Sequence, residues 1–131
     1  MTAYEVLHIV RLRTFEERSY RLICILDEAR VKASDSEDIQ TDLKLVGVLL
    51  AIQDLRLPVI EAIEELDERG TLPENPEKLL VESYDELTKL CITALSITGE
   101  TDINGGFRPH YGYAVVGRKI HSLLNLVVER P

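Results

Sequence analysis

Residues 12–33 read LRTFEERSYRLICILDEARVKA, and the spacing of the small and apolar side chains in this stretch decides the fold class. Seven of them follow one another at alternating steps of three and four residues: Leu12, Phe15, Ser19, Leu22, Leu26, Ala29 and Ala33. Residues three and four apart are neighbours on one side of an α-helix, so this spacing indicates a core-facing stripe. We therefore expect a long helix from about residue 2 to residue 33.

The beginning of this segment permits two interpretations. Thr14-x-x-Glu17 has the form of a capping box, which marks the first turn of many helices. If a helix begins there, residues 5–13 are a separate element, and the alternation of Val10 and Leu12 with arginines also permits a β-strand. We favour a helix, continuous or broken, over a strand.

A second helix is predicted after a short turn at residues 33–36. Ser34-x-x-Glu37 is another capping-box pattern, and Gly70 suits the left-handed conformation that ends many helices. Pro58 lies between them, where its ring and its missing N–H are predicted to kink the helix or to split it. Apolar residues keep the helical spacing on both sides of this proline: Leu45, Val48 or Leu49, Ile52 and Leu55, then Val59, Ile63 and Leu66.

Two further helices are predicted in the second half of the chain. Asn75 is a good N-cap and Pro76 suits the first helical position, so a third helix begins there and ends at Gly99. The Asn-Gly-Gly sequence at residues 104–106 is typical of a hairpin turn, and a fourth helix follows from about residue 113. The core-facing residues of these helices are predicted to be Leu80, Tyr84, Leu87, Cys91 and Ala94, and Tyr113, Val116, Ile120, Leu123 and Val127.

The whole chain is predicted to be one all-α domain spanning residues 1–131. Four main helices joined by short connections favour an antiparallel bundle. Hydrophobic residues make up 45% of the chain and charged residues 29%, which is typical of a globular protein. Trp is absent and aromatic residues account for only 5%, so the core must consist mainly of Leu, Ile and Val.

Cysteine usage and hydropathy indicate a cytoplasmic protein. Cys24 and Cys91 both lie in apolar runs, where a free cysteine usually packs as a small apolar side chain. No apolar run approaches the roughly 20 residues that cross a bilayer, and no basic segment precedes the first apolar residues. We therefore expect two buried thiols and no association with a membrane.

The charge of the chain is concentrated in its middle. Residues 34–90 carry fifteen acidic and five basic residues, whereas the segments on either side are close to neutral. Proteins that bind nucleic acids usually carry the opposite sign, because their affinity depends on neutralising phosphates. Direct binding of DNA or RNA is therefore disfavoured, and a basic protein partner is favoured.

Four acidic residues in this middle segment share one helix face: Glu61, Glu64, Glu65 and Glu68. Like charges at this spacing repel one another by about 0.2–0.5 kcal/mol per pair, so the set is locally unfavourable. This permits a functional interpretation, in which the face binds a basic protein. The alternative is a solvated face that lies opposite the apolar residues of the same helix.

The segment before the last helix is the second candidate for a functional site. Its glycines allow a ligand to approach the backbone, and its basic side chains suit a phosphate or carboxylate near a helix N-terminus. The alternative is an ordered connection without a ligand, because the spacing matches no known phosphate-binding fingerprint. The candidate ligand-binding residues are Gly105, Gly106, Arg108, His110 and Tyr111.

No residue pattern predicts a metal, a cofactor or a catalytic residue. Glu5-x-x-His8 is one half of the pattern used by di-metal helical bundles, but the chain contains no second copy. No Gly-x-Ser-x-Gly sequence is present either, so a nucleophile elbow is not indicated. We therefore favour a protein that is not an enzyme.

Three short stretches are apolar on nearly all sides of their predicted helices: Leu22–Leu26, Val46–Ile52 and Leu123–Val128. One small domain has room for only one fully buried helix, so we expect a homo-oligomer, most simply a dimer. The alternative is a compact monomer whose loops and long Lys and Arg side chains cover these stretches. The leading hypothesis is a small interaction or regulatory protein with an acidic surface for a basic partner. The alternatives are an anionic-ligand-binding protein or enzyme using residues 103–113, and an acidic inhibitor that mimics nucleic acid.

Overall fold

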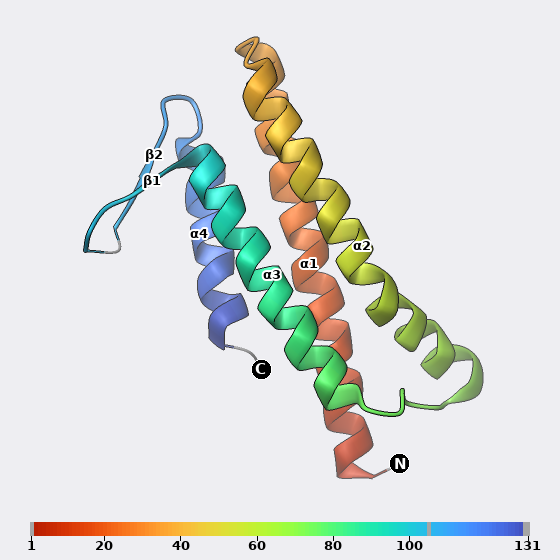
Figure 1. Cartoon of the computed structure of the whole chain (residues 1–131). Coiled ribbons are helices and arrows are strands. Elements are labelled where there is room, and N and C mark those ends of the chain that lie inside the picture. Colours follow the sequence, from red (N-terminus) through yellow and green to blue (C-terminus); the bar gives the residue numbers. More distant parts are fainter. Residues whose placement is uncertain (1, 105, 130–131) are drawn as a thin grey trace.

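The computed structural model describes residues 2–104 and 106–129, which form four helices packed against one another (Figure 1). The predicted all-α class is confirmed, with one small hairpin added between the last two helices. No helix in these two ranges has both the length and the apolarity that crossing a membrane requires. The elements are α1 (Ala3–Asp35), α2 (Ile39–Arg69), α3 (Pro76–Thr98), β1 (Gly99–Thr101), β2 (Phe107–Pro109) and α4 (Ala114–Glu129).

The first helix, α1, is continuous and contains residues 5–13, so neither a strand nor a break occurs there. Its N-cap is Thr2, whose hydroxyl accepts a hydrogen bond from the backbone N–H of Glu5. Thr14 is not a cap, because its hydroxyl donates to the carbonyl of Val10 within the helix. All seven residues of the stripe that predicted this helix are completely buried.

The second helix, α2, begins four residues later than predicted. Asp38 is its N-cap and accepts a hydrogen bond from the N–H of Thr41, because α1 extends to Asp35 and leaves no room for a cap at Ser34. Glu37 bridges the two helices in the left-handed conformation, with φ of 56°. The helix then runs through Pro58 without being split and ends at Gly70.

The third helix and the hairpin follow the sequence signals closely. Asn75 accepts a hydrogen bond from the N–H of Lys78, and Pro76 begins α3 as predicted. The predicted hairpin is confirmed, since β1 and β2 pair in antiparallel fashion with Gly99 opposite Pro109. A Cβ placed on Gly117 of α4 would lie 2.7 Å from the Phe107 ring, so this glycine makes room for the hairpin to pack on the helix.

The core is aliphatic around one aromatic pair, as the composition predicts. Phe15 of α1 and Tyr84 of α3 meet edge to face with 5.1 Å between ring centroids. Cys91 is buried, and this burial raises the pKa of its thiol to about 12. The prediction for Cys24 is wrong: this free thiol is exposed, because it occupies the outer side of α1 between the buried Leu22 and Leu26.

Candidate functional site

A second apolar stripe runs along α2, on the side opposite its core-facing residues. We call it the outer seam, and its members follow one another at steps of four and three residues: Ile39, Leu43, Val46, Leu50, Gln53, Leu57 and Ile60. Four of the apolar members are more than half exposed, with fractions of 72% for Ile39, 65% for Leu43, 58% for Leu50 and 52% for Leu57. The seam therefore exposes apolar side chains to solvent along most of the helix, interrupted by Gln53.

The opposite side of the same helix is fully used by the core. Leu45, Ile52 and Val59 have no exposed surface, and each lies two residues away from a member of the outer seam. Two residues correspond to roughly 200° around a helix, so the two stripes face in opposite directions. Single exposed apolar residues are common on protein surfaces, but a row of roughly 32 Å is a candidate interaction surface.

The outer seam is bordered by small residues that leave the helix backbone accessible. Gly47 is exposed, and a Cβ placed on it would meet no atom within 4 Å. Ala51, one turn further on, has only a methyl group and is half-buried. Small residues at this spacing allow a second helix to approach closely.

The predicted acidic set lies where the outer seam ends. Glu61, Glu64 and Glu68 are exposed, while Glu65 is half-buried and lies 3.3 Å from Arg69 in an ion pair one turn along the helix. Glu64 continues the spacing of the seam, four residues beyond its last apolar member. The apolar row and the acidic set thus form one continuous face of α2.

Two ion pairs tie this end of α2 to α1. Arg56 donates to Glu16 at 2.6 Å, and its side chain is mostly buried. Arg13 donates to Asp67, also at 2.6 Å, but both side chains are more than half exposed. The acids of the set are therefore displayed on a helix that is anchored to its neighbour.

The residues predicted as a ligand site lie along the hairpin. The N–H of Gly106 donates to the Asp102 carboxylate at 2.7 Å, so an acidic group of the chain itself uses this amide. Arg108 is exposed and pairs in register with Glu100. Gly105 lies outside the described residues.

The other two candidate residues of this segment follow the second strand. The Nε2 of His110 lies 3.9 Å from the Glu100 carboxylate, and its backbone N–H donates to the carbonyl of Thr98. The side chain of Tyr111 is entirely exposed. A ligand site at this segment therefore stays a prediction. The same contacts are also expected if the segment only connects α3 to α4 and binds no ligand.

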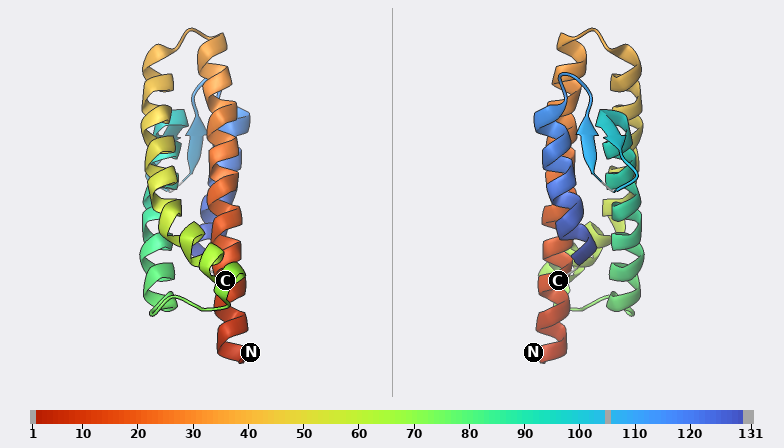
Figure 2. Two further views of the ribbon diagram at one scale, coloured as in Figure 1. Left: turned by 90° about the vertical axis from the view of Figure 1, so that its right-hand side faces the viewer. Right: turned by 90° about the vertical axis from the view of Figure 1, so that its left-hand side faces the viewer.

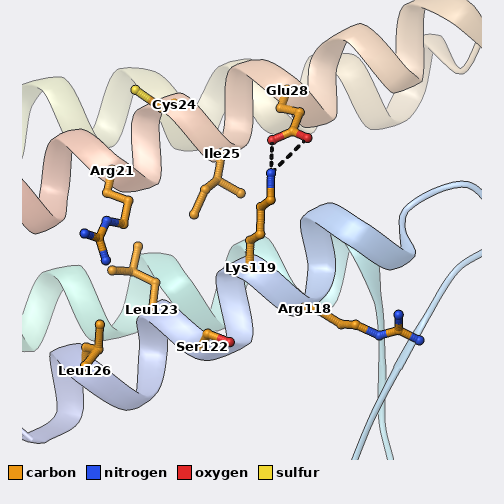
Figure 3. A pocket seen from close by; sticks show the side chains of 9 residues that line it. All are labelled: Arg21, Cys24, Ile25, Glu28, Arg118, Lys119, Ser122, Leu123 and Leu126. Atoms are coloured by element: carbon orange, nitrogen blue, oxygen red, sulfur yellow. Dashed lines mark hydrogen bonds and ion pairs between the residues drawn. The ribbon is translucent and has the colours of Figure 1, made fainter.

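A groove between α1 and α4 is the feature that sequence reasoning missed (Figure 3). It encloses about 560 Å³ above the apolar side chains of Ile25, Leu123 and Leu126. Lys119 of α4 crosses the groove and contacts both carboxylate oxygens of Glu28 on α1, at 2.9 and 3.1 Å. Its two walls are about a hundred residues apart in the chain, so spacing along the sequence gives no direct signal for it.

The fold places the acidic middle of the sequence on one side of the molecule and the nearly neutral ends on the other. Figure 2 shows α1 and α4 on one side of the bundle and α2 and α3 on the other. The first pair contains seven acidic and eight basic residues, whereas the second contains eleven acidic and five basic residues. The excess of negative charge therefore lies on the side that carries the outer seam.

The structure brings no metal-binding group together among residues 2–104 and 106–129. His8 is buried, and its Nδ1 lies 2.8 Å from the carbonyl of Tyr4, which can only accept a hydrogen bond, so this nitrogen is the donor. No protein-family model, curated protein or solved structure matches the chain. The function must therefore be argued from the surfaces described above.

Proposed function

We propose that this chain is a small cytoplasmic interaction protein that forms a homodimer through the outer seam of α2. The observation that carries the proposal is the exposed row of apolar side chains at the spacing of a coiled coil. The acidic set at the end of the seam binds a basic protein partner. In this proposal the subunit is an antiparallel bundle whose second helix bends at Pro58.

The dimer hypothesis rests on α2 alone, and not on all three of the stretches that are apolar around their helices. Most apolar residues of Leu22–Leu26 and Leu123–Val128 are buried or half-buried within one subunit. Only the stretch Val46–Ile52 belongs to a longer row of exposed apolar residues. A second copy of the chain carries the same row, so it supplies a partner of matching chemistry.

The order of residues in the outer seam favours antiparallel pairing around Gln53. A two-fold axis at this residue places Val46 against Ile60 of the second copy and Leu50 against Leu57 of the second copy. The only polar member of the seam then meets itself, and two amide groups can donate to and accept from each other. Such a polar pair within an apolar seam fixes the register of the helices.

Charge also favours this orientation over a parallel one. In the antiparallel pair, Lys44 lies beside Glu61 of the second copy, nine residues on one side of Gln53 and eight on the other. A parallel pair would instead place Glu61 and Glu64 against their own copies, and like charges repel. The two acidic sets therefore lie at opposite ends of the proposed dimer.

Sedimentation equilibrium of the full chain and of two charge-introducing variants tests the dimer. Leu50→Glu places a charge in the middle of the outer seam, while Ile92→Glu makes the same change on α3, where the side chain is 53% exposed. We expect a dimer for the parent chain and for Ile92→Glu, and a monomer for Leu50→Glu. A parent chain that stays monomeric up to about 100 μM would contradict the proposal.

The basic partner is tested with a synthetic helical peptide that carries Leu on one face and Lys on the other. The chain with Glu61→Lys, Glu64→Lys and Glu68→Lys is expected to lose binding of this peptide. The control chain carries Glu77→Lys, Glu82→Lys and Glu86→Lys on α3, where all three residues are also exposed. Equal binding by both variants would remove this part of the proposal.

A further inference from the structure

We propose that the groove between α1 and α4 binds a single-chain amphiphile with an anionic head group, either a carboxylate or a phosphate. The groove lies away from α2, so the inference stands independently of the dimer. Its volume of about 560 Å³ falls within the range of small-molecule sites, which is about 300–1,000 Å³.

The floor of the groove suits a hydrocarbon chain. Ile25 of α1 and Leu123 of α4 line it from opposite walls, and Leu126 extends the apolar surface toward the end of α4 (Figure 3). These side chains are buried or half-buried, so they form a fixed wall and do not move freely in solvent. A hydrocarbon tail lying on them removes its own apolar surface from water, together with the small part of the floor that is still exposed, and this burial is the main source of favourable free energy.

The rim of the groove carries the charge that selects the head group. Arg21, Arg118 and Lys119 line it against a single acid, Glu28, in a chain whose net charge is −8. An anion is therefore attracted to this part of the surface, and a cation is not. The rim and the floor together specify an anionic amphiphile.

The two ends of the groove differ, and this difference places the head group. At one end Lys119 is held by both oxygens of Glu28, so its charge is already neutralised. At the other end Arg21 extends from α1 toward α4, and its partner Glu17 lies 3.5 Å away with both side chains more than half exposed. An exposed pair of this kind contributes little stability, so Arg21 can exchange its partner for an anionic head group.

The bridge between Lys119 and Glu28 favours a slender ligand over a partner helix. A helix with its side chains is about 10–12 Å wide and needs a groove that is open along its whole length. The ion pair joins the two walls at one end, so a docked helix would have to break it. A hydrocarbon tail instead ends in front of the bridge and leaves it intact.

The test is a titration of the full-length chain, labelled with ¹⁵N, with three amphiphiles that share a twelve-carbon tail. Dodecanoate and dodecyl phosphate carry anionic heads, and dodecyltrimethylammonium carries a cationic one; all are used below their micelle-forming concentrations. We expect both anionic compounds to bind one per chain, with amide shifts at Ile25 and Leu123. The tighter of the two identifies the natural head group, and the cationic compound is expected to bind roughly tenfold more weakly.

A matched pair of variants separates the groove from general surface charge. Arg21→Gln is expected to weaken binding of the anionic amphiphiles roughly threefold to tenfold. Arg69→Gln is the control, because Arg69 forms the same kind of pair with a glutamate one turn away but lies on α2. Equal binding of the cationic compound, shifts centred on the outer seam, or equal losses in both variants would overturn the proposal. Tighter binding of an acidic amphipathic peptide in the groove would also overturn it.

Discussion

The two sides of α2 carry the same kinds of residues at the same helical spacing, but one side is buried and the other is largely exposed. The inner side, with Leu45, Ile52 and Val59, is completely covered by the other helices. On the outer side, Leu43, Leu50 and Leu57 are all more than half exposed. Composition and spacing alone therefore do not tell a buried stripe from an exposed one; the difference is whether the other helices of the same chain cover it.

The largest effect that tests this contrast is expected from truncating one residue on each side. Ile52→Ala removes a fully buried side chain and is expected to lower the free energy of unfolding by about 2–5 kcal/mol. Leu50→Ala removes an exposed side chain and is expected to change it by less than about 0.5 kcal/mol. Urea denaturation followed by circular dichroism, at a concentration where the chain is monomeric, measures both. Similar losses in the two variants would mean that Leu50 is covered within one subunit.

A smaller effect is expected from the two helical glycines. A Cβ on Gly117 would meet the Phe107 ring at 2.7 Å, so Gly117→Ala is expected to destabilise the monomer by about 1–3 kcal/mol. A Cβ on Gly47 meets nothing within 4 Å, so Gly47→Ala is expected to stabilise the monomer by about 0.5–1 kcal/mol. Thermal unfolding of the dilute chains compares them. A destabilised Gly47→Ala monomer would show that this side of α2 is already packed.

Gly47→Ala also tests the proposed dimer, at concentrations high enough for the chain to associate. The added methyl group lies at the border of the outer seam, where the proposed dimer brings two backbones close together. We therefore expect this variant to form a weaker dimer although its monomer is more stable. Sedimentation equilibrium measures the change, and a dimer of unaltered strength would argue against close packing of the two helices.

The smallest predicted effect concerns the start of α2. The pKa of the Asp38 carboxyl lies below its ordinary value of 3.8, chiefly because it accepts hydrogen bonds from Thr41 and also from the hydroxyl of Tyr113. A lowered pKa means that the ionised form stabilises the fold above pH 3.8, and that this contribution is lost as the pH falls through the lowered pKa. Asp38→Asn is expected to reduce the acid sensitivity of unfolding. An unchanged pH profile between 2 and 6 would show that this cap carries no charge-dependent stability.

Much of the fold was predictable because apolar residues three and four apart share one face of a helix, and that face packs into the core. Every residue of the stripe from Leu12 to Ala33 is buried, and Asn75 and Pro76 begin α3 as expected. The start of α2 was missed because Ser34 has a good capping pattern but lies inside the longer α1. Cys24 was misplaced because an apolar run around a residue does not say which side of the helix that residue faces.

The candidate surfaces were less predictable for a physical reason. The outer seam is visible in the sequence as a second spacing through Leu43, Leu50 and Leu57, but a helix with two apolar sides is normally central in a fold. Only the packed structure shows that much of one of these sides stays exposed among the described residues. The groove between α1 and α4 depends on two helices distant in sequence meeting side by side, which local patterns do not determine.

Oxidative cross-linking of a Gln53→Cys variant tests the pairing of outer seams most directly. The variant is made together with Cys24→Ser, and the remaining Cys91 is buried. A two-fold axis at residue 53 predicts a covalent dimer, whereas a cysteine at Gln40, placed roughly 40 Å from its copy, is expected to give none. Equal cross-linking of the two variants, or none in either while the chain is dimeric, would contradict antiparallel pairing centred on Gln53.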